Sequence, residues 1–139
     1  MTDREHLPTP GGLAPGLRGT ATLVVGPEHT AQAFGSGNAP VFSTPRMVAL
    51  MEAAAVDALE GHLAPGDITL GTRVEIVHLA ATPIGEPVRA EAELVGVTGR
   101  RLAFRVTAWD AHEKIGGGLH ERAVVNAARF LERVAARRP

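Results

Sequence analysis

Two residues of this chain combine chemical reactivity with positions where such side chains seldom lie without a partner or a role. Glu52 is the only charged residue between Met47 and Val56, in a stretch of otherwise apolar side chains. His78 lies on the apolar face of an alternating segment, residues 72–80. A carboxylate and an imidazole in one small core can act as a general-base pair. A histidine bonded to a backbone carbonyl, or a structural ion pair, explains the same two residues.

A third candidate is Thr44, a hydroxyl directly before Pro45. A threonine in that position is typical of a helix cap, and it can also serve as a nucleophile. Thr44 and Glu52 are eight residues apart, so one straight helix separates them by about 12 Å. They act on one substrate only if the pocket is elongated, the first helical turn unwinds, or they come from different subunits.

Near the C-terminus, alternation places His120 and Arg122 on one face of a strand and Glu121 on the other. A solvated charged patch is the ordinary explanation. Because three glycines precede this segment, Arg122 can also reach an anionic or polar group in a pocket. Glu75, His78 and His120 are possible metal ligands, but their spacing matches no recognised set, and we expect no metal.

Three arginines spaced by four residues form a stripe at the C-terminal end: Arg129, Arg133 and Arg137. Cations near a helix C-terminus offset the helix dipole, which is the simpler interpretation. A docking surface for the phosphates of coenzyme A is the functional one.

Composition restricts the class of protein. The 139 residues fit one domain, 1–139, with an extended arm over residues 1–19. The absence of cysteine excludes disulfides, thiolate nucleophiles and zinc–thiolate sites, and the net charge of −1 argues against a nucleic-acid partner. No apolar run is long enough to span a membrane and the N-terminus is polar, so we expect a soluble, cytoplasmic protein. Only 4% of residues are aromatic, which suggests that a partner subunit supplies part of the core.

The hydrophobic pattern predicts an order of elements. A strand (20–25) precedes a loop (27–42) in which Gly35–Asn38 is mobile. A helix follows, capped by Ser43 or Thr44, ending near Gly61 and buried on nearly all sides. Four antiparallel strands (72–80, 88–97, 101–110 and 114–126) and a terminal helix (127–138) with Phe130, Leu131 and Val134 inward complete the chain.

This order predicts an α+β architecture of the hotdog type, an antiparallel sheet curled around a long central helix. One small sheet cannot cover such a helix alone. We therefore expect a homodimer, and the sequence leaves open whether dimers pair further into tetramers.

Four segments together resemble the fluoroacetyl-CoA thioesterase family of hotdog proteins: residues 41–52, 70–83, 99–102 and 118–124. The similarity covers roughly residues 40–131. It implies a hydrolase that cleaves an acyl-CoA thioester between paired subunits, and we expect no cofactor. It further implies that Thr44, Glu52 and His78 are catalytic, that Arg122 lines the substrate pocket, and that the Gly71 backbone contacts the thioester carbonyl.

The chain departs from the family in the lid before the helix, which is rich in phenylalanine in the fluoroacetate-specific enzyme. Here the segment is Gly35–Asn38, with Phe34 and Phe42 nearby. This difference predicts that the substrate is another acyl-CoA. An acyl-CoA hydratase or dehydratase on the same fold, a non-catalytic acyl-CoA-binding module and a purely structural dimerising protein are the alternatives.

Overall fold

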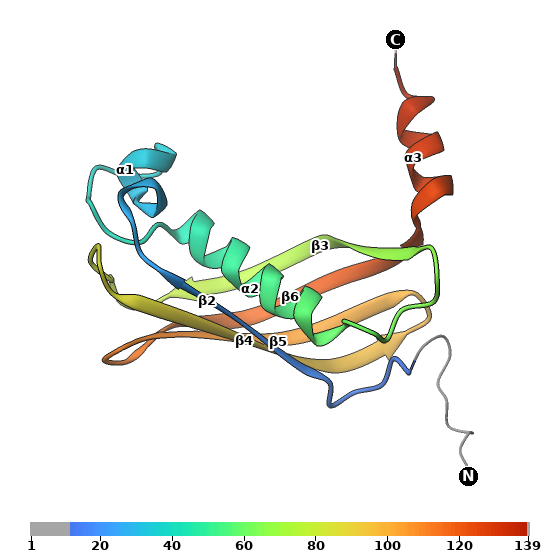
Figure 1. Ribbon diagram of the computed structural model, residues 1–139, viewed down its shortest axis with the longest axis horizontal. Helices are drawn as coiled ribbons and strands as arrows, with labels where there is room; N and C mark the ends of the chain where they lie inside the picture. The colour runs from blue at the N-terminus through green and yellow to red at the C-terminus, as the bar shows by residue number, and fades with distance from the viewer. Residues whose placement is uncertain (1–11, 139) are drawn as a thin grey trace.

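A computed structural model describes residues 12–138, and its elements follow the predicted order (Figure 1). The elements are β2 (Arg18–Val24), η1 (Pro27–His29), α1 (Ala31–Phe34), α2 (Thr44–Ala58), β3 (Asp67–His78), β4 (Pro87–Thr98), β5 (Arg101–Asp110), β6 (Lys114–Asn126) and α3 (Ala127–Ala135).

The strands form one antiparallel sheet in the order β2-β4-β5-β6-β3. The sheet curls around α2, which lies along one of its faces (Figure 1). The predicted α+β arrangement of a curled sheet and a central helix is therefore confirmed. β5 and β6 have the predicted bounds. Alternating side chains mark the two strands, and a tight turn at Gly99, whose φ is +61°, separates β5 from β4.

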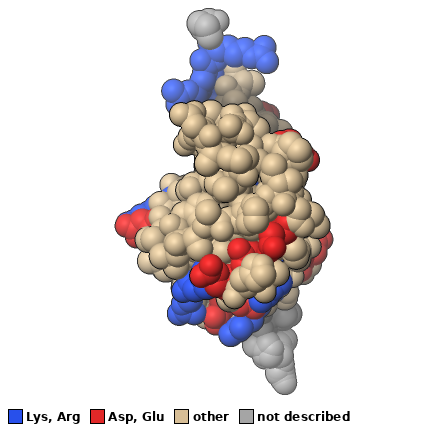
Figure 2. Space-filling view, turned by 90° about the vertical axis from the view of Figure 1, so that its left-hand side faces the viewer, with Lys and Arg blue, Asp and Glu red and all other residues tan. Residues whose placement is uncertain are grey.

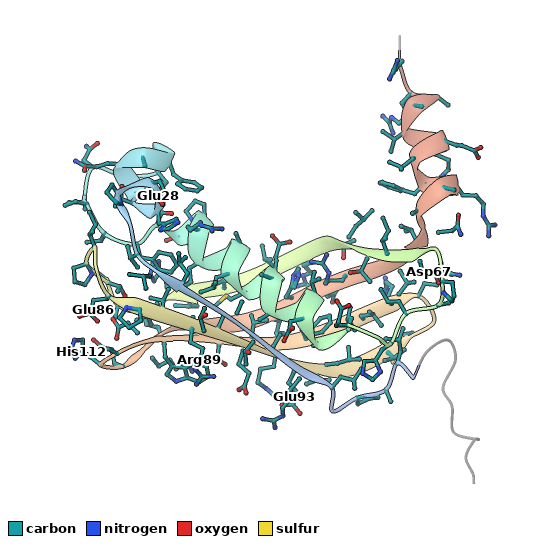
Figure 3. All side chains as sticks on the ribbon, viewed as in Figure 1. Glu28, Asp67, Glu86, Arg89, Glu93 and His112 are labelled. Atoms are coloured by element: carbon teal, nitrogen blue, oxygen red, sulfur yellow. The ribbon has the colours of Figure 1, made fainter. Side chains whose placement is uncertain are left out.

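Alternation along the central strands separates core from surface. On β4, Val88, Ala90, Ala92 and Leu94 are buried beneath α2. Arg89 and Glu93 project from the opposite face of the sheet (Figure 3). Arg105 on β5 donates a hydrogen bond to Glu93 across that face, at 2.9 Å. Viewed from the end that carries α1, the upper body shows mostly uncharged side chains, and charged ones gather on its lower part (Figure 2).

Helix α2 begins at Thr44 because Ser43 caps it: the Ser43 hydroxyl accepts the Arg46 backbone N–H at 3.2 Å. Pro45 fits the first turn, where its missing N–H has no partner to lose. The alanine-rich face lies close to the sheet. A Cβ added at Gly19 of β2 would collide with the backbone of Ala58, so only glycine permits this approach.

One side of α2 is open in a single chain, contrary to the expectation that the helix is buried on nearly all sides. Its core face buries Met47, Leu50, Met51, Ala54, Ala55 and Ala58. On the open side Ala53, Val56 and Asp57 are exposed, and Val56 has 47% of its surface accessible. The prediction is wrong for the single chain because one curled sheet covers only one side of a helix.

The terminal helix α3 also differs from the prediction. It ends at Ala135 rather than residue 138, and it stands away from the sheet instead of packing on it (Figure 1). None of its residues is buried, and Leu131 and Val134 are 60% and 49% exposed. Amphipathic spacing identified the helix correctly, but the spacing alone does not fix which surface receives its apolar side.

The N-terminal region contains more regular structure than predicted, since the sequence predicted an extended arm through residue 19 and a loop over residues 27–42. β2 begins at Arg18 because Gly19 and its neighbours pair with β4. Upstream, Leu13 is buried, and the Gly16 N–H donates to the Leu94 carbonyl at 2.8 Å. The segment after β2 contains the two short helices η1 and α1. Residues 1–11 of the expected arm lie outside the described residues.

Candidate functional site

Helix α2 presents Thr44 and Glu52 at different heights. Thr44 is its first residue and Glu52 follows eight residues later, so they are separated by about 12 Å along the axis. The first turn is helical and does not unwind to bring them together. Each has its own partners. We refer to Thr44 and His78 as the threonine–histidine pair, and to Glu52, Gly71, His120 and Arg122 as the glutamate–arginine cluster.

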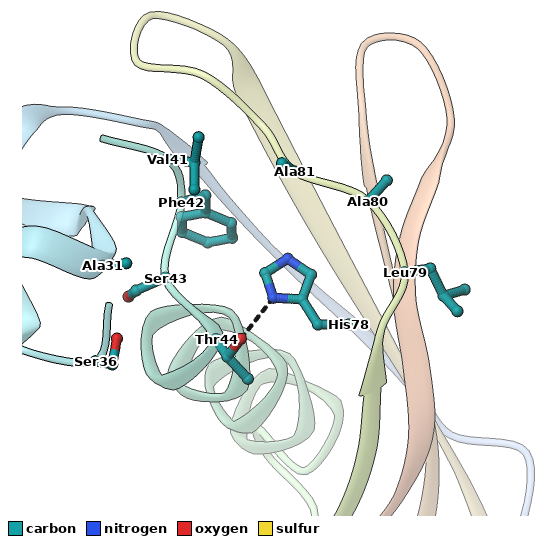
Figure 4. A pocket seen from close by; sticks show the side chains of 10 residues that line it. All are labelled: Ala31, Ser36, Val41, Phe42, Ser43, Thr44, His78, Leu79, Ala80 and Ala81. Atoms are coloured by element: carbon teal, nitrogen blue, oxygen red, sulfur yellow. Dashed lines mark hydrogen bonds between the residues drawn. The ribbon is translucent and has the colours of Figure 1, made fainter. Parts of the chain in front are cut away.

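The threonine–histidine pair forms where the end of β3 meets the beginning of α2. The Oγ1 atom of Thr44 lies 2.7 Å from Nδ1 of His78 (Figure 4). Thr44 is exposed and His78 is half-buried. The Nε2 atom of His78 is buried and has no hydrogen-bond partner among the described residues.

Desolvation by burial lowers the pKa of His78 from its ordinary value of 6.5, and the backbone of Ala80 opposes part of this shift. The ring is therefore neutral at pH 7. A neutral imidazole can accept the Thr44 hydroxyl proton at Nδ1, which makes the hydroxyl a better nucleophile or hydrogen-bond partner. Thr44 is not the cap of α2, because Ser43 has that role.

A cavity of about 360 Å³ opens beside this pair (Figure 4). The residues that line it are Ala31, Ser36, Val41, Phe42, Ser43, Thr44, His78, Leu79, Ala80 and Ala81. Small side chains from α1 and the loop after it, Ala31 and Ser36, contribute to the wall. Phe34 is 49% exposed and Phe42 is 1% exposed within the core. Of these two phenylalanines only Phe42 lines the cavity, and most of the other lining side chains are small.

The glutamate–arginine cluster is centred on Arg122. Its Nε donates to Thr69 Oγ1 at 2.9 Å, and its Nη2 donates to the Thr69 carbonyl at 3.0 Å. Its Nη1 lies 3.2 Å from His120 Nε2 and 3.6 Å from Glu52 Oε2. Burial lowers the pKa of Arg122 and Glu52 opposes this shift; the guanidinium stays charged at any physiological pH.

Of the two interpretations of His120 and Arg122, the solvated patch is excluded. Their exposed fractions are only 1% and 6%, because β6 lies between β5 and β3 and both side chains point to the face beneath α2. Val124 is buried on the same face. Continuing its alternation backwards along the strand would have indicated a buried histidine and arginine, so a signal for His120 exists in the sequence.

Gly71 lies against the cluster from β3. In the ladder it is opposite Arg122, next to an irregularity between Gly71 and Arg73. A Cβ added at Gly71 would lie 2.5 Å from Glu52 Oε2 and 3.3 Å from the His120 ring. Bulges of this kind often re-aim backbone groups beside active sites. Glycine thus lets β3 approach the carboxylate closely.

The three residues weighed as metal ligands are separately engaged. Glu75 pairs with Arg73 at 3.0 Å, His78 contacts Thr44, and His120 contacts the Arg73 carbonyl. Across residues 12–138, no group of three or more histidine, aspartate or glutamate side chains is placed to hold a metal ion. In the same range, no helix is long and apolar enough to cross a membrane.

Of the arginine stripe, Arg129 and Arg133 lie on α3 and Arg137 follows its end; α3 is at the end of the molecule opposite α1 (Figure 1). Arg129 and Arg133 line a cavity of about 200 Å³ together with Arg100. Within one chain this basic surface is remote from the threonine–histidine pair.

Comparison with known proteins identifies relatives of this chain. A family model described as fluoroacetyl-CoA-specific thioesterase matches residues 25–128. A fluoroacetyl-CoA thioesterase of Streptantibioticus cattleyicolor is 48% identical over 99 residues, which are 71% of each chain.

Solved structures agree. The fluoroacetyl-CoA thioesterase FlK superposes with a TM-score of 0.86 at 41% identity, covering 92% of this chain and 99% of FlK. A hot-dog-like protein from Thermanaerovibrio acidaminovorans superposes with a TM-score of 0.83 at 26% identity, covering 91% and 94%. FlK has been solved as a threonine-to-alanine variant with fluoroacetate and a threonine-to-serine variant with acetyl-CoA. The chain therefore belongs to the fluoroacetyl-CoA-specific thioesterase family, a family of thioester hydrolases with the hotdog fold.

Proposed function

We propose that this protein hydrolyses a small acyl-CoA thioester, with Thr44, Glu52 and His78 as catalytic residues and Gly71 and Arg122 as substrate-binding residues. The observation that carries the proposal is the 2.7 Å contact between Thr44 and His78 at the edge of an open cavity. The FlK complexes with fluoroacetate and acetyl-CoA support the substrate class.

The chemistry adds water across the carbon–sulfur bond. The acyl carbon gains an oxygen, and the sulfur of coenzyme A leaves and takes a proton. A neutral His78 removes the proton from the attacking hydroxyl or water, and it can return that proton to the thiolate. The Glu52 carboxylate acts either as the first nucleophile or as a second base. The Gly71 backbone and Arg122 bind the thioester carbonyl, where negative charge develops.

We further propose that two copies of the chain form one site. Within a single chain the threonine–histidine pair and Glu52 are too far apart to touch one carbonyl carbon. An antiparallel arrangement of two α2 helices brings the pair of one copy to Glu52 of the other. The open side of α2 and the accessible Glu52 carboxylate, with 40% of its side chain exposed, are compatible with this arrangement.

The sheet edge supports the same assembly. β3 is a 12-residue edge strand in which Val74 and Val77 are 46% and 60% exposed, and Leu79, directly after it, is 58% exposed. Long apolar edges are usually paired or covered. Pairing of two β3 strands would extend the sheet across both copies and pair the free backbone groups of this edge.

The cavity limits the acyl group. Its walls near His78 include Ala31, Ser36 and Val41, and its volume is about 360 Å³. We therefore propose short acyl groups as substrates, without selectivity for the fluorinated one, because the lid segment has small side chains instead of several phenylalanines.

A panel of acyl-CoA esters tests the proposal. Acetyl-, fluoroacetyl-, propionyl-, butyryl- and octanoyl-CoA are supplied to the purified protein, and release of the free thiol is followed. Short esters should release coenzyme A well above the uncatalysed rate. Binding of the esters without thiol release would indicate a binding module, and a hydrated acyl-CoA product would indicate a hydratase. Either result would overturn the proposal.

A further inference from the structure

His120 is a buried titratable group that the proposed reaction does not use. Its Nδ1 lies 2.8 Å from the Arg73 carbonyl oxygen. A carbonyl can only accept, so Nδ1 carries the hydrogen. In a neutral ring the other nitrogen, Nε2, then has a free lone pair. Burial and the charge of Arg122 both lower the pKa of His120, and this outweighs the opposing contributions of the Arg73 carbonyl and nearby carboxylates.

That lone pair faces Arg122. The Nη1 of Arg122 lies 3.2 Å from His120 Nε2 and donates to it. A protonated His120 would instead point an N–H at an N–H. The Arg122 contact therefore requires a neutral His120 with its hydrogen on Nδ1. The Arg73 carbonyl requires the same tautomer, so the two contacts agree.

The contacts of Arg122 with Thr69 and His120 limit how Arg122 can pair with Glu52. Arginine and carboxylate groups prefer a two-point ion pair with parallel hydrogen bonds. Here Thr69 takes Nε and Nη2, and His120 takes a hydrogen of Nη1. Only one corner of the guanidinium faces Glu52, at 3.6 Å, which is longer than a hydrogen bond. The charge of the Glu52 carboxylate is therefore balanced by Arg122, but Arg122 does not form a two-point ion pair with it.

We propose that His120 is a positioning residue, which with Thr69 fixes the Arg122 guanidinium so that Arg122 cannot close into a two-point ion pair with Glu52. The inference rests on the function proposed above, in which Glu52 and Arg122 act on the thioester. A Glu52 held at one corner keeps an oxygen free for the reaction, and Arg122 keeps hydrogens free for the substrate.

A matched pair of variants tests the inference. His120→Phe retains ring volume but removes the acceptor, and His120→Gln offers an amide oxygen near the position of Nε2. We expect His120→Phe to lower kcat by about 10- to 100-fold with little change in KM, since small misplacements of a reacting group have effects of this size. His120→Gln should recover most of the loss. Thr69→Val, which removes the other side-chain acceptor, should lower kcat in the same direction by a smaller factor.

A double-variant cycle separates positioning from general destabilisation. If His120 acts through Arg122, adding His120→Phe to Arg122→Lys should lower kcat little further. Additive losses, or a His120→Phe enzyme with the kcat of the wild type, would overturn the inference.

An NMR readout does not depend on turnover. The Arg122 Nη1 hydrogens should exchange slowly with water in the wild type and in His120→Gln, and rapidly in His120→Phe. Slow exchange in all three would contradict the positioning role even if the enzyme is active. An inactive wild type with the expected exchange pattern would reject the proposed function and retain the contact.

Discussion

The threonine–histidine pair and the glutamate–arginine cluster lie along the same helix, yet they differ in how completely their polar atoms are paired. Arg122 has three hydrogen-bonding contacts and an ion pair, and His120 uses both ring nitrogens. His78 has one side-chain partner, and its Nε2 is buried without one in the described chain.

This difference distinguishes a pre-organised charge, the Arg122 guanidinium, from a reactive group beside a cavity, the Thr44 hydroxyl with His78. Fully paired buried networks hold a fixed geometry, because each lost contact leaves a costly unsatisfied atom. The Arg122 and His120 side chains of the glutamate–arginine cluster fit that description, whereas the Glu52 side chain is 40% exposed and lies 3.6 Å from Arg122. The threonine–histidine pair, in contrast, lies beside a cavity, where the exposed Thr44 can meet a substrate or a water. The comparison leads to the expectation that the pair performs proton transfer while the cluster orients and stabilises charge.

The largest loss of activity is expected from a change in the threonine–histidine pair. His78→Ala removes the proposed base, and general-base losses commonly reach about 1,000-fold in rate. We expect kcat/KM, measured by thiol release, to fall by about that factor with an unchanged melting temperature. His112→Ala is the matched control, since His112 is exposed, contacts Glu86 (Figure 3) and does not line the cavity. Equal activity of both variants would remove His78 from the mechanism.

A smaller effect is expected where β3 approaches the cluster. Gly71→Ala places a methyl group 2.5 Å from the present position of Glu52 Oε2, so the flexible carboxylate must move. Because the displacement is local, kcat should fall by about tenfold and stability should change little. Gly96→Ala is the control, as its Cβ would make an ordinary 3.7 Å contact with Ala103. Wild-type kcat in Gly71→Ala would show that the carboxylate position is not critical.

The smallest effect concerns stability against pH. The pKa values of His78 and His120 are lowered in the folded chain, whereas both titrate near 6.5 when unfolded. The unfolded state therefore binds more protons below pH 6.5, and the free energy of unfolding should fall as the pH drops. The slope is at most about 1.4 kcal/mol per pH unit for each histidine.

Urea unfolding at several pH values between 5 and 8 measures this slope. His120→Gln should flatten the acid dependence, because one of the two neutral histidines is gone. An acid dependence identical to that of the wild type would mean that His120 does not titrate differently in the folded and unfolded states.

Much of this architecture is readable from the sequence, and the failures have a common cause. Alternation and turn chemistry predict β5 and β6 to the residue, and capping at Ser43 predicts the start of α2. These features are local. The placement of α3 and the open side of α2 depend on which elements lie opposite each other, and a single alternating segment does not contain that information.

The candidate site divides in the same way. Glu52 and His78 are detectable as polar residues in apolar patterns. That His78 contacts Thr44 while Glu52 faces Arg122 depends on the order of strands in the sheet, which places β3 and β6 side by side. His120 is followed by Glu121 and Arg122, and this charged run favours a solvated patch, although the fold buries the His120 side chain.

The central claim is that the pair of one copy acts with Glu52 of another. Co-expression of a His78→Ala chain and a differently tagged Glu52→Gln chain, followed by purification on both tags, isolates the mixed dimer. If the site is shared, the mixed dimer contains one intact site and should show about half of the wild-type kcat, although either parent is nearly inactive. A mixed dimer as inactive as its parents would contradict the claim and place Thr44, Glu52 and His78 in separate roles within one chain.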